Sequence, residues 1–139
     1  MLTINRLDLT DARKLIAGAI EKSNEIGVPM CIAITDESGN LIAFERMDGG
    51  KVTSATIAID KSFTASAARK ATHEYGQASQ PGAAAYGIGS AIGGRLMVVG
   101  GGLLVIVNGE VVGGIGVSSG TPAQDMEVAQ AGIDAFLAS

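Results

Sequence analysis

The chain has 139 residues, of which 47% are hydrophobic and 17% charged, so it is long enough to bury a core and too apolar to stay disordered. Its formal net charge of −4 argues against binding to a nucleic-acid backbone. It has a single cysteine, no apolar run long enough to span a membrane and no N-terminal apolar segment typical of a secretion signal, so we expect one cytoplasmic domain over 1–139.

The first third of the chain predicts a helix followed by a hairpin. The helix is expected over 8–26, with Asp8 as its cap and Gly27 as its left-handed end. Strands are predicted over 30–35 and 41–46. Because the connector between them is short and rich in turn-forming residues, the two strands should pair antiparallel.

A second helix is predicted over 53–70, with Thr53 or Ser54 as its cap. One stripe of this helix carries apolar side chains at i, i+4 spacing: Ile59, Phe63 and Ala67. A second face carries only small side chains: Ala55, Ala58, Ser62 and Ala65. A face of small side chains lets a helix approach a sheet or another helix closely.

Two shorter elements precede a glycine triplet. Residues 72–79 predict one or two further helical turns, and 96–99 predict a short strand. The triplet Gly100–Gly102 comes next, and glycines within or beside strands mark places where a ligand or another backbone comes close. We therefore predict that these glycines and the hairpin after them form the floor of a small-molecule site.

The last part of the chain is a hairpin followed by a helix. Asn108-Gly109 between two apolar runs predicts a type I′ turn. Thr121, Pro122 and Gln124 form a capping box with proline at the first helical position, so the final helix should start there. The order helix, hairpin, helix, strand, hairpin, helix favours an α+β fold with one antiparallel sheet of about five strands.

Lys61 and its neighbour Asp60 are the candidate catalytic residues. They interrupt a helix that is otherwise built from small and apolar side chains. Adjacent helix positions point about 100° apart, so at most one of the two can face a given neighbour. A lysine drawn into an apolar wall can hold a carboxylate, or lose its proton and act as a base or amine nucleophile. The alternative is that its amine extends to the surface.

Other motifs give weaker functional signals. Ser118 lies in a G-x-S-x-G pattern, but the only histidine, His73, precedes it, which is the wrong order for an α/β-hydrolase. The glycine spacing also departs from the dinucleotide-binding fingerprint. One histidine and one cysteine cannot form an N/S-type zinc site within one chain, so we predict no metal site unless haem binds at His73. His73 could be a haem axial ligand or a general base, and the alternative is an exposed residue on a polar segment.

An ordered set of short motifs covers essentially the whole chain. They are Gly27-Val28-Pro29, Asp36-x-x-Gly39, Glu45-Arg46-Met47-Asp48-Gly49, Ala58-x-Asp60-Lys61-x-x-Thr64-Ala65, Pro81-Gly82 with Tyr86-Gly87, the Gly100–Gly102 triplet, and Gly113-x-x-Gly116-Val117-Ser118-x-Gly120-Thr121-Pro122-x-x-Asp125. This set resembles the GlcG/HbpS family, whose domain also forms the C-terminal part of PduO-type proteins.

The resemblance implies a profilin-like α+β domain, with helices on both faces of the sheet, and homo-oligomers built from dimers. It also implies binding of haem or another tetrapyrrole, because some members bind or handle haem, with Arg46 or Lys61 meeting the propionates. A small lyase or isomerase acting on an organic carboxylate through Lys61 is the first alternative, and a structural oligomer without a ligand is the second. Ligand contacts are predicted at Arg46, Lys61, Gly100, Gly101, Gly102 and Ser118.

Overall fold

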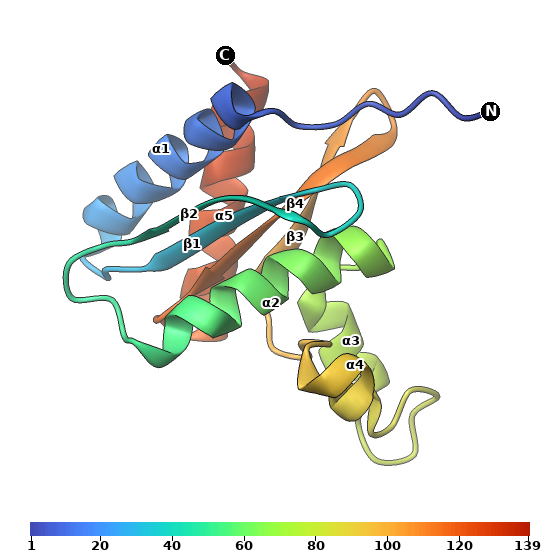
Figure 1. The fold of residues 1–139 in the computed structure, drawn as a ribbon. Helices are drawn as coiled ribbons and strands as arrows, with labels where there is room; N and C mark the ends of the chain where they lie inside the picture. Colours follow the sequence, from blue (N-terminus) through green and yellow to red (C-terminus); the bar gives the residue numbers. More distant parts are fainter.

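Figure 1 shows an antiparallel sheet with helices on both faces and the strand order β2-β1-β4-β3. The structure, a computed structural model, describes all 139 residues. The strands are β1 (Cys31–Asp36), β2 (Leu41–Arg46), β3 (Gly102–Val107) and β4 (Glu110–Ser118). The helices are α1 (Leu9–Ile26), α2 (Thr53–Ala68), α3 (Thr72–Ala78), the short α4 (Ala91–Gly94) and α5 (Pro122–Leu137), with a 3-10 turn at Ile88–Ser90. The predicted α+β class is confirmed.

Local capping signals set the starts of the two helices on one face, α1 and α5. The carboxylate of Asp8 accepts the backbone N–H of Asp11 at 2.9 Å, and the backbone N–H of Asp8 donates to the Asp11 carboxylate at 3.0 Å. Thr121 and Gln124 make the same reciprocal pair at α5, at 3.2 and 2.9 Å. Gly27 ends α1 in the left-handed conformation. Each capping-box bond joins residues three positions apart, and the predicted caps of α1 and α5 are confirmed.

The sheet has four strands, so the expectation of about five is wrong. The missing strand is 96–99, which pairs with no neighbour. The side chain of Thr64 in α2 accepts the backbone N–H of Met97 at 2.9 Å and donates to the carbonyl of Arg95 at 3.1 Å. Because a helix side chain satisfies these backbone groups, they need no partner strand.

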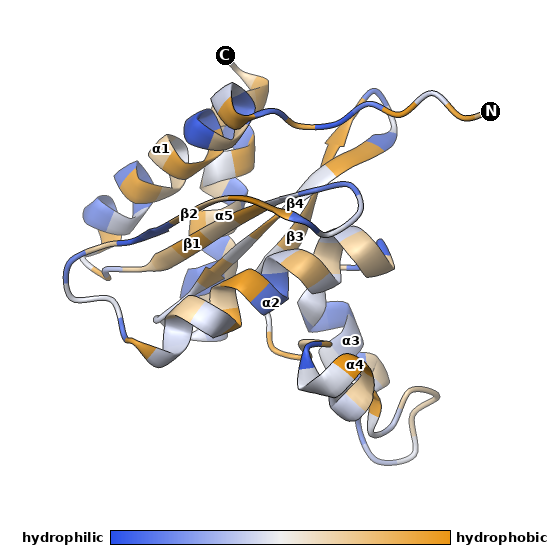
Figure 2. Ribbon diagram, in the orientation of Figure 1, coloured by the Kyte–Doolittle hydropathy of each residue, from blue (hydrophilic) through white to orange (hydrophobic).

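The main hydrophobic core lies between the sheet and the pair α1 and α5, which cover the same face (Figure 1). Its largest fully buried apolar side chains are Leu15, Met30, Ile32, Ile34, Val105, Ile115, Val117 and Val128. Figure 2 shows the same division, with apolar residues concentrated in the strands and polar residues on the outer turns of α1. Removing this aliphatic surface from water is the main stabilising contribution to the fold.

The other face of the sheet is covered by α2 at unusually short range. A Cβ atom at Gly116 would collide with the carbonyl of Ala58, and one at Gly114 would lie 2.8 Å from the carbonyl oxygen of Ser62. The glycines of β4 therefore let the helix backbone rest on the strand backbone, and the predicted close approach of the small-residue face is confirmed. On the stripe that begins at Ile59, Ile59 and Phe63 are partly buried and Ala67 is exposed.

The predicted cap of α2 is wrong. Its N-cap position is Val52, and no side chain there accepts a backbone N–H. Ser54 is instead buried on the face that meets the sheet. The start of α2 is therefore set by packing against the sheet rather than by a local capping bond.

Candidate functional site

Lys61 lies at the centre of the contact between α2 and the sheet, with only 1% of its surface exposed. Its ammonium donates to the carbonyl oxygen of Val117 at 2.9 Å and to the Asp125 carboxylate, also at 2.9 Å. The amine therefore does not extend to the surface. It joins α2 to the end of β4 and to the first turn of α5, which lie 56 and 64 residues further along the chain.

Asp125 is the functional candidate that the sequence reasoning missed. One oxygen of its carboxylate binds Lys61 and the other accepts the backbone N–H of Gly120 at 2.9 Å. The residue lies in the first turn of α5, where a negative charge is favoured by the helix dipole. A signal was available, because Asp125 precedes Ala129 by four residues and so lies on the buried stripe of α5. A carboxylate on such a stripe needs a buried partner.

Gly101 closes the remaining side of this pair. A Cβ atom there would lie 2.5 Å from the carbonyl oxygen of Val117, 2.7 Å from the Lys61 ammonium and 2.9 Å from the Asp125 Cβ. Its φ of 130° is also a value that side chains other than glycine rarely adopt. The glycine is thus required by the close approach of the ion pair. The sequence predicted a close approach at this backbone, and the group that approaches is the Lys61–Asp125 pair.

The chemistry available to this cluster follows from its enclosure. Burial lowers the pKa of Lys61 from its ordinary value, and the hydrogen bond and charge of Asp125 partly offset this. With Lys61 only 1% exposed, a substrate carboxylate could reach the ammonium only if the surrounding elements moved. None of the surface hollows is lined by Gly100–Gly102 or by Lys61. The catalytic and ligand-binding roles of these residues stay predictions.

Asp60 points away from Lys61, as the helix geometry requires. Its carboxylate accepts a hydrogen bond from the Arg95 guanidinium at 3.0 Å, and Arg95 lies over the ring of Phe63 at 3.8 Å from the ring centre. Arg95 remains 43% exposed. The structure therefore separates the two candidate catalytic residues, with one inside the protein and the other at its surface. A catalytic role for Asp60 also stays a prediction.

Arg46 and Ser118 lie at the same end of the sheet, opposite Cys31 on its two neighbouring strands. Ser118 is 5% exposed, whereas Arg46 is exposed and makes no ion pair. The loop after Arg46 is held to the end of β4, because the backbone N–H of Lys51 donates to the Ser119 hydroxyl at 3.1 Å. One chain therefore suffices to bring the Arg46 loop to the hairpin.

His73 lies in α3, next to Gly100 of the glycine triplet. Its Nδ1 atom is buried and has no hydrogen-bond partner. A Cβ atom at Gly100 would lie 3.4 Å from the His73 Cβ and 2.9 Å from the sulfur of Met126, so the histidine and the thioether flank the same glycine. No three His, Cys, Asp or Glu side chains are grouped so as to hold a metal ion. None of the helices combines the length and apolar character needed to cross a lipid bilayer.

Known proteins resemble this chain over nearly its whole length. A 15.0 kDa protein from the dhaT-dhaS intergenic region of Citrobacter freundii is 41% identical over 133 residues, covering 96% of this chain and 94% of that protein. The corrinoid adenosyltransferase PduO of Salmonella typhimurium is 36% identical over 130 residues. That match covers 94% of this chain but only 39% of PduO.

Two crystal structures share the fold closely. The Klebsiella pneumoniae protein ORFY has a TM-score of 0.97 at 35% identity, covering 100% of this chain and 96% of that one. The PduOC:heme complex has a TM-score of 0.89 at 36% identity, covering 94% of each chain. The family model described as "Haem degrading protein HbpS-like" matches residues 7–134. The chain therefore belongs to the HbpS-like family.

Proposed function

We propose that this protein binds haem or another tetrapyrrole in an assembly of several copies of the chain. The observation that carries the proposal is the haem complex of PduOC, a domain that shares 36% identity and nearly the whole fold with this chain. The family description, which refers to haem, supports the same ligand class. Adenosyl transfer is not part of the proposal, since the chain matches only 39% of PduO.

His73 is the residue that would hold the iron, since it is the only histidine in the chain. Imidazole is a common axial ligand of haem, and this imidazole has a buried Nδ1 without a partner inside the chain. The residue thus fits the group in donor type, and because Nδ1 is buried, Nε2 is the nitrogen that would hold the iron. Bound haem would supply an iron centre whose reactivity is set by its axial ligands and surroundings.

The surroundings of His73 support an assembly rather than a pocket within one chain. No hollow is lined by His73, so a haem on this side chain needs other surface to cover it. The segment from 86 to 99 exposes three large apolar side chains: Tyr86, Ile92 and Val99, which are 70%, 58% and 43% exposed. Apolar surface of this kind is typical of interaction sites. A second copy of the chain is the partner we propose for it.

Contacts to the propionates are proposed at Arg46, whose guanidinium is exposed and makes no ion pair. Lys61 is a weaker candidate, since its ammonium already binds Asp125. An arginine also suits a carboxylate better, because its planar guanidinium can make two parallel hydrogen bonds.

Titration with hemin tests the proposal. The wild type should give a Soret shift that saturates at a fixed ratio to the chain, and the His73→Ala variant should lose it, because no other imidazole can replace His73. Glu74→Ala, at the next and exposed position of α3, is the matched control and should titrate like the wild type. Broad absorbance growth without saturation would contradict haem binding. Native mass spectrometry of the same samples gives the oligomer mass and the haem-to-chain ratio.

A further inference from the structure

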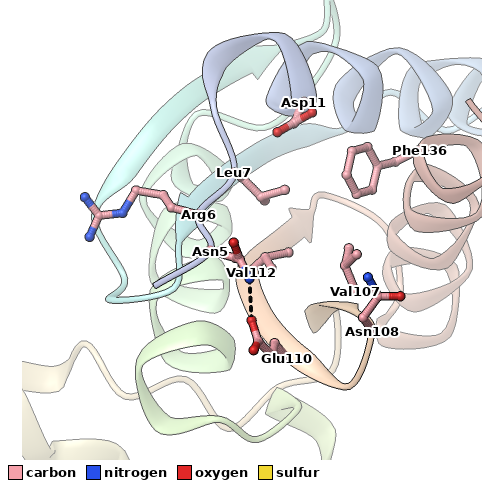
Figure 3. Close-up of a pocket in the computed structure, with 9 residues that line it drawn as sticks. All are labelled: Asn5, Arg6, Leu7, Asp11, Val107, Asn108, Glu110, Val112 and Phe136. Atoms are coloured by element: carbon pink, nitrogen blue, oxygen red, sulfur yellow. Dashed lines mark hydrogen bonds between the residues drawn. The ribbon is translucent and has the colours of Figure 1, made fainter. Parts of the chain in front are cut away.

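A hollow of about 500 Å³ lies at the opposite end of β4 from Lys61. It is surrounded by the N-terminal arm (residues 5–7), the first turn of α1, the last turn of α5 and the β3–β4 hairpin (Figure 3). Its apolar wall comes from four side chains: Leu7, Val107, Val112 and Phe136. A volume of several hundred Å³ with an apolar wall and a few polar groups is characteristic of small-molecule sites.

Two of the polar side chains that line this hollow, Asp11 and Glu110, are carboxylates. The amide of Asn5 donates to one oxygen of Glu110 at 2.7 Å, which orients this carboxylate and leaves its second oxygen without a partner. One oxygen of Asp11 accepts the backbone N–H of Asp8, and its other oxygen has no partner in the chain. Figure 3 shows Asp11 and Glu110 on opposite sides of the opening.

The one cation that lines the hollow does not neutralise these carboxylates. The guanidinium of Arg6 donates to both oxygens of Glu37, at 2.6 and 2.8 Å, and in Figure 3 it points away from the opening. The hollow therefore combines an apolar wall with two carboxylates and no cation directed into it. This charge pattern complements a positively charged ligand with an aliphatic body.

We propose that this hollow binds a small aliphatic amine, and that it binds a diamine better than a monoamine. The methylene chain would pack on Leu7, Val112 and Phe136. One ammonium would meet Glu110 and the second would meet Asp11. Because both carboxylates are reached by water, each contact is modest, and the expected dissociation constant is on the order of 1 mM. The site uses none of the residues proposed to hold haem.

The test is a titration of the isotope-labelled protein with 1,4-diaminobutane, followed by backbone amide NMR shifts. We expect saturable shifts confined to the arm, the hairpin and the ends of α1 and α5, with weaker binding of n-butylamine and none of butyrate. Glu110→Gln keeps the acceptor for Asn5 but removes the charge, so it should weaken diamine binding about fivefold. Asp11→Asn should reduce diamine binding towards that of n-butylamine.

Glu74→Gln is the control, because it removes one exposed carboxylate from α3, which does not line the hollow. It should bind diaminobutane like the wild type. Equal losses in the Glu74 and Glu110 variants would overturn the proposal, because they would show general attraction to an acidic protein. Saturable binding of butyrate with the same shifts, or unsaturated shifts spread over the whole surface, would overturn it as well.

Discussion

Asp60 and Lys61 are consecutive in α2, and each forms an ion pair, but in opposite surroundings. Lys61 and Asp125 are 2.9 Å apart with side chains 1% and 3% exposed. Asp60 and Arg95 are 3.0 Å apart with side chains 13% and 43% exposed. Since the distances are nearly equal, the difference lies in access to water. Inside the protein a charge that loses its partner has no solvent to stabilise it, whereas at the surface water replaces the partner. Contact distance alone therefore does not show which pair contributes more to stability.

The largest effect is expected from breaking the interior pair. Asp125→Ala leaves the Lys61 ammonium with only the Val117 carbonyl, so it should lower the free energy of unfolding by about 3–5 kcal/mol. Urea denaturation at neutral pH measures the change. Burial already lowers the pKa of Lys61, and losing the carboxylate removes the contributions that raise it. The variant should therefore recover stability as the pH rises, because a neutral amine is less costly to bury.

A double variant tests whether the loss of stability comes from leaving one buried charge without its partner. Lys61→Met with Asp125→Asn removes both charges together, keeps an acceptor for the Gly120 N–H and should recover most of the loss, since neutral replacements of a buried ion pair are often tolerated. If Asp125→Ala cost less than about 1 kcal/mol, the pair would behave like a surface one and the comparison would fail.

An intermediate effect is expected for Arg6 and Glu37, a pair with one exposed and one buried member, 53% and 4% exposed. The hydrogen bond from Arg6 is the main cause that lowers the pKa of Glu37 from 4.5 to about 2. Because the folded-state pKa lies below the unfolded one, this stabilisation is complete above pH 4.5 and is lost as the pH falls towards 2. The stability difference between wild type and Arg6→Ala should therefore shrink over that range.

Denaturant titrations at several pH values check the Arg6 prediction. Arg13→Ala is the matched control, because Arg13 is exposed on α1 and makes no ion pair. Its stability difference from the wild type should not depend on pH over the same range. A difference for Arg6→Ala that stayed constant down to pH 2 would mean that Arg6 does not act through the Glu37 carboxylate.

What the sequence predicted well depends on contacts between near neighbours. The capping boxes at Asp8 and Thr121 and the Asn108-Gly109 turn each involve four residues or fewer, so the pattern contains the whole interaction. The missing strand at 96–99 and the partner of Lys61 could not be found in this way. Thr64 reaches Met97 across 33 positions and Lys61 reaches Asp125 across 64, and no local pattern specifies such distances.

The candidate site shows the same limit. The glycines were correctly identified as places of close approach, but periodicity does not say whether a ligand or a helix fills the space. At Gly114 and Gly116 the neighbour is the backbone of α2, and at Gly101 it is the Lys61 ammonium. A glycine pattern records the absence of a side chain, and only the packed structure identifies what occupies the space.

The smallest effect is expected from the surface pair. Asp60→Asn keeps the size of the side chain and leaves Arg95 over the ring of Phe63, so it should lower the free energy of unfolding by less than about 1 kcal/mol. Arg95→Ala should cost more than Asp60→Asn, since it also removes the contact with Phe63.

Urea denaturation at low and high salt measures both variants. Salt should reduce the effect of Asp60→Asn, because ions reach the exposed guanidinium of Arg95, and leave most of the effect of Asp125→Ala, because both members of that pair are buried. Equal salt dependence in the two variants would show that the interior pair is open to solvent and that the contrast between residues 60 and 61 does not hold.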